Sequence, residues 1–163
     1  MKLLSILIYL IVLISVPLFE LLAKKHIKAR KLPCYNKDKT IMFHYVKNRG
    51  MMLGVHKNKP RFVLITTIIV LTITILISLY VFLAFEKLYI LKIGLILLSG
   101  GSLSNSLERF IYRYVIDYFS FPNCIFKKVR NVVFNFADIC IFLGFFIIII
   151  GCLFIWLKEV IYI

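Results

Sequence analysis

The chain has 163 residues, of which 62% are hydrophobic and 17% charged, and its mean hydropathy is +0.97. These values exclude an ordinary water-soluble domain, and the length leaves room for one domain. The net charge of +14 would suggest a nucleic-acid partner in a soluble protein. No nucleic-acid-binding motif is visible, so we expect the cations to face anionic lipid head groups instead.

Four uncharged runs of 17, 24, 15 and 19 residues cover Leu3–Phe19, Phe62–Phe85, Ile93–Leu107 and Ile139–Leu157. A transmembrane helix needs about 20 apolar residues, and tilt or snorkelling lysines cover a shortfall. We therefore predict an all-α integral membrane protein whose single domain, 1–163, has four transmembrane helices at about 3–23, 62–85, 88–107 and 138–157. A cleaved signal peptide is the alternative for the first run, but the run is long and no small-residue cleavage site follows it.

Two polar loops connect these spans, together with one short turn at Glu86-Lys87. The first loop, residues 24–61, holds 12 Lys and Arg residues and one acid, and its segment 40–48 has the β-branched and aromatic residues of a strand. The second loop, residues 108–137, is rich in aromatic residues, which favour the membrane interface. With four spans, both loops lie on one side of the membrane, and both termini and the short turn lie on the other.

Acidic residues are scarce, and four of the seven fall near the loop-bearing ends of the spans: Glu20, Glu108, Asp117 and Asp138. Polar residues that are difficult to place in lipid accompany them: Asn48, Gly50, Asn105, Arg109 and Asn135. Asn105, Glu108 and Arg109 share one helix face by their spacing of three and four residues. A carboxylate at the membrane boundary is unfavourable unless it is partnered, neutralised or functional.

The simplest role for Asn135 or Asp138 is to cap the last helix, whose first backbone N–H groups lack partners. Capping does not explain Asp117, which lies in an apolar, aromatic run. Two neighbouring carboxyls resist joint ionisation and tend to share a proton, an arrangement that suits peptide hydrolysis. An intramembrane aspartyl hydrolase is therefore one hypothesis, and a small transporter or channel with a structural acid pair is another.

No metal or cofactor is expected. The three histidines, His26, His44 and His56, lie in the first loop and none forms an HExxH motif. The four cysteines have no metal-binding or redox spacing. The Gly100-Gly101 pair and the nearby serines indicate close packing of helices rather than a nucleophile.

Five motifs in order along the chain resemble those of the lipoprotein signal peptidases, the type II signal peptidases of bacteria. They are Glu20-Leu-Leu-Ala-Lys24, Asn48-Arg-Gly50-Met-Met-Leu-Gly54, Gly100-Gly-Ser-Leu-Ser-Asn105-Ser-Leu-Glu108-Arg109, Tyr114-Val-Ile-Asp117-Tyr and Phe134-Asn135-Phe-Ala137-Asp138. Glu20 and Glu108 stand where the family has aspartate, which marks a divergent member. The resemblance covers nearly the whole chain.

The resemblance implies a membrane aspartyl endopeptidase that removes the signal peptide of a diacylglyceryl-modified prolipoprotein, cleaving before the lipidated Cys. It places catalysis on Asp117 and Asp138, and the surrounding polar shell on Asn48, Gly50, Asn105, Arg109 and Asn135. Glu20, Lys24 and Glu108 are expected to form structural acid–base pairs, and we expect a monomer. The alternative on the same scaffold is a non-catalytic protein that binds lipid or lipoprotein, or a small carrier.

The resemblance also implies a location in the bacterial cytoplasmic membrane, with the site near the outer leaflet and a small extracytoplasmic β-rich element built from the first, longer loop. The positive-inside rule points the other way, because 17 of the 21 Lys and Arg residues lie on the loop side. We favour the extracytoplasmic orientation, because the site must meet a substrate that has already been exported.

Overall fold

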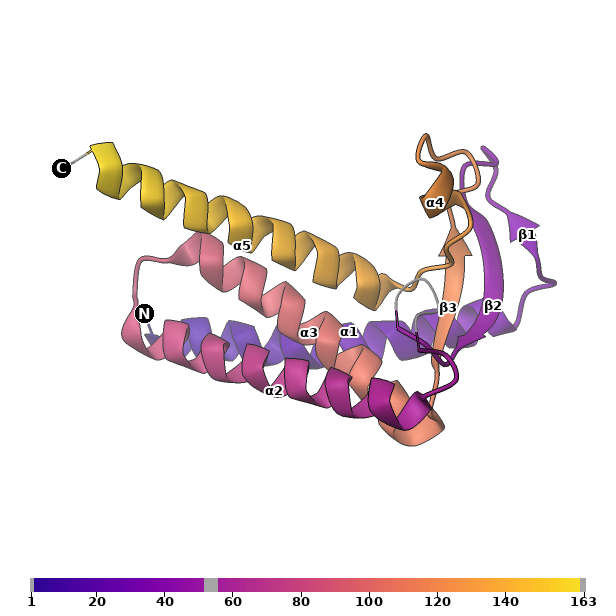
Figure 1. The fold of residues 1–163 in the computed structure, drawn as a ribbon, viewed down its shortest axis with the longest axis horizontal. Helices are drawn as coiled ribbons and strands as arrows, with labels where there is room; N and C mark the ends of the chain where they lie inside the picture. The colour runs from indigo at the N-terminus through magenta and orange to yellow at the C-terminus, as the bar shows by residue number, and fades with distance from the viewer. Residues whose placement is uncertain (1, 52–55, 162–163) are drawn as a thin grey trace.

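The computed structural model describes residues 2–51 and 56–161. Four long helices form a bundle, and a small sheet and a short helix lie together at one end of it (Figure 1). The helices are α1 (Lys2–Lys28), α2 (Pro60–Ala84), α3 (Tyr89–Tyr112), α4 (Lys127–Arg130) and α5 (Phe136–Ile161), and the strands are β1 (Cys34–Tyr35), β2 (Met42–Asn48) and β3 (Val115–Ser120). The four long helices are each long and apolar enough to cross a membrane. The predicted fold class is confirmed.

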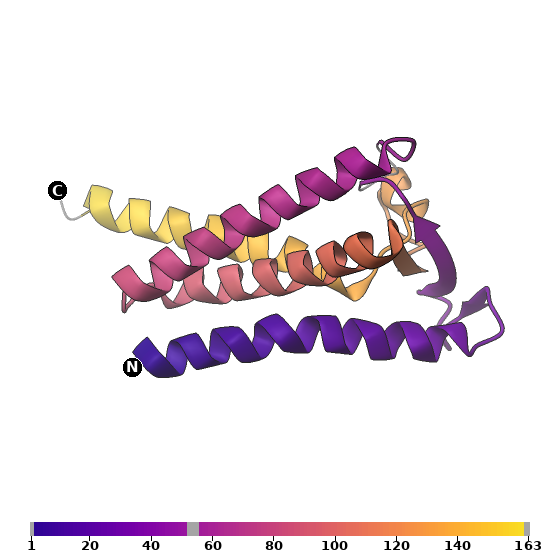
Figure 2. The ribbon, with the colours of Figure 1, turned by 90° about the horizontal axis from the view of Figure 1, so that it is seen from below.

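Helix α3 is the central helix of the bundle and packs against α1, α2 and α5 (Figure 2). It is also the least apolar of the four, because its inner face carries serines, asparagine and arginine. The other three helices expose leucine, isoleucine and phenylalanine over most of their length. In a membrane this distribution is expected, because lipid accepts apolar side chains and polar ones must find partners inside the protein.

Two helices run beyond the apolar runs from which they were predicted. Helix α1 continues to Lys28 and so includes Lys24, and α3 continues to Tyr112 and so includes Glu108 and Arg109. Lys24 and Glu108 find ion-pair and hydrogen-bond partners inside the protein, so their charges do not end the helix. The short turn between α2 and α3 occupies residues 85–88, and the antiparallel hairpin expected at Glu86 is confirmed.

The three strands form an antiparallel sheet in the order β1-β2-β3. The strand predicted within residues 40–48 is β2, and it pairs with β3 so that Val46 lies opposite Asp117 and Asn48 opposite Val115. Phe119 of β3 forms a further bridge with Phe134, two residues before α5 begins. This bridge brings the start of α5 against β3.

Candidate functional site

The first turn of α5 is closed by a reciprocal pair of hydrogen bonds between Asn135 and Asp138. The Asn135 side-chain oxygen accepts a bond from the Asp138 backbone N–H at 2.9 Å, and Asp138 Oδ2 accepts one from the Asn135 backbone N–H at 3.2 Å. This is a capping box, with the asparagine as the cap and the aspartate three residues on. The capping role predicted for Asn135 is confirmed, and Asp138 keeps its other oxygen for a second contact.

The remaining N–H groups of this turn are also satisfied, by side chains from other elements. The Ala137 N–H donates to Glu20 Oε1 of α1 at 2.6 Å, and the Phe136 N–H donates to the Tyr118 hydroxyl of β3 at 3.2 Å. A largely buried helix start needs such partners, because its first N–H groups have none within the helix. The sequence analysis missed Tyr118, and only its position beside Asp117 on a strand pointed to it.

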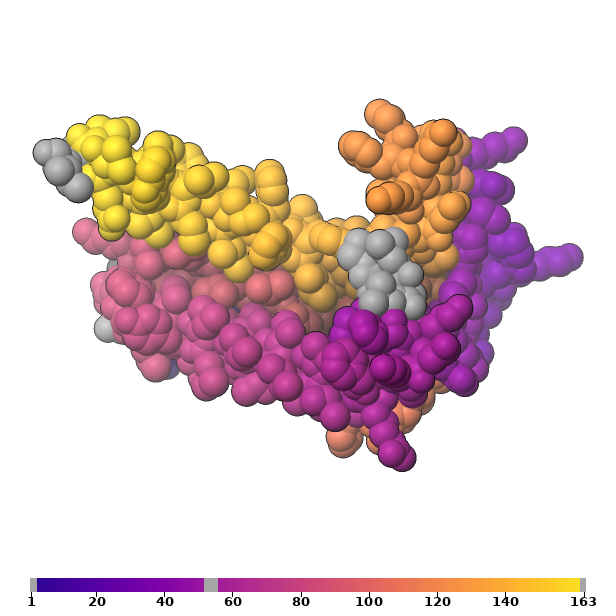
Figure 3. Space-filling view, viewed as in Figure 1, coloured from indigo at the N-terminus to yellow at the C-terminus, as the bar shows by residue number. Residues whose placement is uncertain are grey.

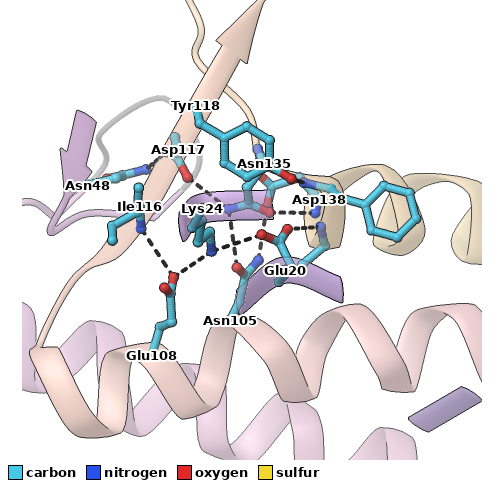
Figure 4. Close-up of polar contacts among 12 residues, drawn as sticks. Glu20, Lys24, Asn48, Asn105, Glu108, Ile116, Asp117, Tyr118, Asn135 and Asp138 are labelled. Atoms are coloured by element: carbon cyan, nitrogen blue, oxygen red, sulfur yellow. Dashed lines mark hydrogen bonds and ion pairs between the residues drawn. The ribbon is translucent and has the colours of Figure 1, made fainter. Parts of the chain in front are cut away.

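Asp117 and Asp138 come together through two asparagines. Asn135 Nδ2 donates to Asp117 Oδ1 at 2.8 Å and to Asn105 Oδ1 at 3.2 Å, while Asn105 Nδ2 donates to Asp138 Oδ1 at 2.9 Å (Figure 4). Asn48 Nδ2 donates to the second oxygen of Asp117 at 2.9 Å. Each of the four carboxyl oxygens therefore accepts a hydrogen bond from an amide, and Asn135 contacts both acids.

Gly50 contributes through its backbone. Its N–H donates to Asn48 Oδ1 at 2.9 Å, which leaves the amide group of Asn48 turned toward Asp117. Of the second motif, Met52, Leu53 and Gly54 lie outside the described residues. Gly50 thus orients Asn48, and Asn48 contacts Asp117.

The environment of Asp117 favours its neutral form. The side chain is 4% exposed, and its direct partners are uncharged amides. Burial, reinforced by the negative charge of Asp138, raises the pKa of Asp117 to about 7, and the bonds from Asn48 and Asn135 offset only part of this rise. Near neutral pH the pair can therefore hold one proton between its two carboxyls.

Lys24 forms the ion pairs beneath the site. Its ammonium lies 3.0 Å from Glu20 Oε2 and 2.7 Å from Glu108 Oε2, and both Lys24 and Glu20 are at most 5% exposed. Glu108 Oε2 also accepts the N–H of Ile116, next to Asp117, at 3.1 Å. This network connects α1 and α3 to the strand and the helix that hold the two aspartates, through direct contacts among Glu20, Lys24 and Glu108.

Arg109 has a different position from the one expected for a partner of these acids. It is buried and lines the pocket, and its charge acts on Asp117, Asp138 and Glu108 through space. Among the contacts of residues 2–51 and 56–161, the acids bond to Lys24 and to amides, with no hydrogen bond from the Arg109 side chain. Its position in the pocket lining thus differs from that of Lys24, which contacts two acids directly.

A pocket of about 960 Å³ opens over the two aspartates. Figure 3 shows the surface hollowed between α5 and the segment that carries α4. Its lining is partly apolar, with Val70, Leu98, Ile141 and Phe142, and partly polar, with the asparagines and Arg109. Four exposed cations also line the pocket and were not among the predicted site residues: Lys47, Arg49, Lys57 and Lys128. An apolar pocket with a few convergent polar groups is the usual form of a binding site.

The sequence model of signal peptidase (SPase) II matches residues 7–154, which is most of the chain. The chain belongs to the signal peptidase II family. The lipoprotein signal peptidase of Clostridium tetani is 35% identical over 109 residues, which are 66% of this chain and 66% of that protein. The lipoprotein signal peptidase of Halothermothrix orenii is 30% identical over 157 residues, which are 93% of this chain and 97% of that protein.

A solved structure of a bacterial membrane enzyme at 2.3 Å resolution has the same fold, with a TM-score of 0.72 over 89% of this chain and 87% of that chain. Its sequence is 23% identical, so the likeness concerns the fold alone. The resemblance on which the sequence analysis relied is therefore confirmed: the chain is a multi-pass membrane protein of the signal peptidase II family.

Within the signal peptidase II family, two glutamates of this chain depart from the expected sequence. Glu20 and Glu108, which stand where the resemblance leads one to expect aspartate, both reach Lys24. The longer side chains keep the charge and the contact with the lysine. In this member of the signal peptidase II family the departures thus fall in the network beneath the site, and both aspartates over the pocket are retained.

Proposed function

We propose that the chain is an aspartyl endopeptidase that removes the signal peptide from diacylglyceryl-modified prolipoproteins, cleaving before the lipidated Cys, with Asp117 and Asp138 as the catalytic pair. The observation that carries the proposal is that Asn135 hydrogen-bonds both carboxyls within one pocket at the end of the bundle. Family membership supports the peptidase reaction.

Asp117 is the acid of the pair when the substrate arrives. Its pKa of about 7 leaves it protonated in a large fraction of molecules at neutral pH. Asp138 is the base, because it lies in the first turn of a helix of 26 residues, where the helix dipole and the Asn135 N–H favour a negative charge. The two carboxyls thus differ in environment, as an acid and a base in one site must.

Hydrolysis then follows from these two protonation states. The Asp138 carboxylate accepts a proton from a water molecule, whose oxygen bonds to the scissile carbonyl carbon, while Asp117 donates its proton to the carbonyl oxygen. When the intermediate collapses, the C–N bond breaks, the nitrogen takes the proton held by Asp138, and a hydroxyl of the intermediate returns a proton to Asp117. The products are a new carboxyl terminus on the signal peptide and a free amino group on the lipidated Cys.

The substrate's position follows from the walls of the pocket. The diacylglyceryl chains lie against the apolar wall formed by Val70, Leu98, Ile141 and Phe142, and the signal peptide occupies the space between helices. Asn48, Asn105, Arg109 and Asn135 hold the acids or the peptide backbone. We also propose that the protein lies in the cytoplasmic membrane of a bacterium, with this pocket near the outer leaflet, where exported prolipoproteins arrive.

The test is a gel-shift assay of a lipidated prolipoprotein with the purified protein. Asp117→Asn and Asp138→Asn are each expected to lower cleavage by at least about a thousandfold, because each removes a group that transfers a proton at the reacting bond. Asp38→Asn, at an exposed loop position, is the matched control and should cleave normally.

Circular dichroism and gel filtration must show that the two inactive variants remain folded. Cleavage by either variant at the normal rate would contradict the catalytic assignment, whereas no cleavage by the folded parent protein would favour a non-catalytic lipid- or lipoprotein-binding protein.

A further inference from the structure

A second groove lies on the opposite side of β3 from the aspartates. Its volume is about 520 Å³, and it is formed by the end of α1, the sheet and the first residue of α5. Asp117 lines the first pocket, and the next two residues of β3, Tyr118 and Phe119, line this groove. The two cavities have no lining residue in common.

The α1 wall of the groove changes character along the helix. Phe19, Leu22 and Ala23 line the part that faces the bundle, and His26 and Arg30 line the outer part. The spacing of three or four residues places Phe19, Leu22, Ala23 and His26 on one face of α1, and Arg30 follows just after the helix ends at Lys28. The groove is thus apolar toward the bundle and cationic at its outer end.

Arg30 is held in place at this outer end. Its Nη2 lies 2.9 Å from His26 Nε2, and its guanidinium carbon lies 5.3 Å from the centre of the Phe43 ring. The contact with His26 uses one of the five N–H groups of the guanidinium. None of the described residues that line the groove is acidic. A negatively charged group is therefore the complement of this end.

We infer that this groove binds an anionic glycerophospholipid, with an acyl chain along Phe19, Leu22 and Ala23 and the head-group phosphate at Arg30 and His26. The inference goes beyond the proposed function, since the groove is separate from the substrate pocket. Arginine suits phosphate because its planar fork donates two parallel hydrogen bonds. A zwitterionic lipid is a poorer ligand, because its ammonium group finds no carboxylate in the groove.

The bound lipid also contacts residues that adjoin the proposed active site. Tyr118 and Phe136 line the groove, and the Phe136 N–H donates to the Tyr118 hydroxyl. Their chain neighbours Asp117 and Asn135 are hydrogen-bonded in the proposed active site. A ligand that packs against Tyr118 and Phe136 binds only the folded arrangement, so it should raise the thermal stability of the protein.

The test is native mass spectrometry of the full chain in detergent, titrated with phosphatidylglycerol, with phosphatidylcholine of the same acyl chains, and with the matching diacylglycerol. We expect one saturable phosphatidylglycerol site and about tenfold weaker binding of the other two lipids, because they lack the net negative charge that pairs with Arg30. Phosphatidylglycerol should also raise the unfolding temperature.

Variants separate this site from general surface charge. Arg30→Gln is expected to weaken phosphatidylglycerol binding about tenfold and to abolish the thermal shift, because it removes the charge-assisted bonds to phosphate. Lys28→Gln removes the same charge from an exposed position of α1 that does not line the groove and should bind normally. Ala23→Phe fills the apolar part and should block all three lipids.

Three results would overturn the inference. Equal loss of binding in Lys28→Gln and Arg30→Gln would mean unspecific attraction to the basic surface. Full affinity in a folded Ala23→Phe variant would mean that no acyl chain enters the groove. Competitive displacement of phosphatidylglycerol by a lipidated prolipoprotein peptide would mean that the groove belongs to the substrate. Because Arg30 is exposed, its substitution leaves the packed interior unchanged, and the first comparison stands even if Ala23→Phe fails to fold.

Discussion

At the scale of single residues, Asn135 connects the two aspartates of the candidate site. It caps α5 with its side-chain oxygen, donates to Asp117 and Asn105 with its amide nitrogen, and donates to Asp138 with its backbone N–H. The sequence identified Asn135 both as a possible cap and, through the resemblance, as part of the polar shell. Only the structure shows that one side chain performs both tasks, because the two tasks depend on where β3 lies relative to α5.

The sequence grouped Glu20, Lys24 and Glu108 as structural acid–base pairs, but it left open which cation each acid would meet. Glu20 lies four residues before Lys24, whereas Glu108 lies beside Arg109 and far from Lys24 along the chain. The structure places both carboxylates on Lys24 and leaves Arg109 facing the pocket. Spacing along a helix defines a shared face, but it cannot choose between partners that lie on different helices.

The bond from Asn48 to Asp117 gives a prediction about pH. Asn48 stabilises the ionised form of Asp117 and so lowers its pKa from the higher value that burial alone would produce. Below about pH 7 Asp117 carries its proton, and above it the proton is lost, so kcat/KM should fall on the alkaline side. In Asn48→Ala the pKa rises, and the alkaline limb should move to higher pH by about one unit.

The measurement is kcat/KM for a lipidated peptide between pH 5 and 9, in the parent protein and in Asn48→Ala. Asn58→Ala is the control, because Asn58 is an exposed residue of the same pocket and makes no bond to the aspartates. An alkaline limb that stays in place, or moves to lower pH in Asn48→Ala, would show that Asp117 is not the group that holds the catalytic proton.

At the scale of the elements, the existence of the four long helices followed from the uncharged runs, and their ends did not. Helix α1 continues through Lys24 because the ammonium has two carboxylates to meet, and α3 continues through Glu108 because its carboxylate meets Lys24 and the Ile116 N–H. A run of apolar residues shows which part of a helix can lie in lipid. It does not show where a charge has a partner inside the bundle.

Helix α3 approaches two neighbours through adjacent glycines, as the sequence suggested for Gly100 and Gly101. A methyl group added at Gly101 would collide with the Ala137 carbonyl oxygen at the start of α5, one residue before Asp138. A methyl group at Gly100 would meet the Val16 side chain of α1 at 3.0 Å, which a small movement relieves. Alanine should therefore disturb the helix packing more at Gly101 than at Gly100, and the two substitutions form a matched comparison.

We expect Gly101→Ala to lower the rate of prolipoprotein cleavage by about tenfold or more and to destabilise the protein by about 1–3 kcal/mol, because backbone must move to make room. Gly100→Ala should retain most of the cleavage rate and most of the stability. The readouts are the gel-shift rate and thermal unfolding in the same detergent. Normal activity in Gly101→Ala would show that the spacing of α3 and α5 does not set the geometry of Asn105 and Asp138.

At the scale of the whole molecule, the polar residues of the proposed site lie at one end of an apolar helix bundle. The sheet, α4 and the proposed active site lie at that end, and the chain termini and the α2–α3 turn lie at the other (Figure 1). Both cavities open at the functional end and each combines an apolar wall with cations. The 17 basic residues predicted for the loop side can thus bind lipid or substrate there, a role that the positive-inside rule does not consider.

The orientation can be tested directly, because the two ends differ in exposed residues suitable for labelling. In a variant without its native cysteines, a Cys at Lys39, which is exposed between β1 and β2, should react in intact cells with a thiol reagent that cannot cross the membrane. A Cys at Lys87, exposed in the turn at the opposite end, should react only after lysis. The reverse pattern would place the basic loops in the cytoplasm. The pocket would then open away from exported prolipoproteins, and neither their cleavage nor the outer-leaflet location could stand.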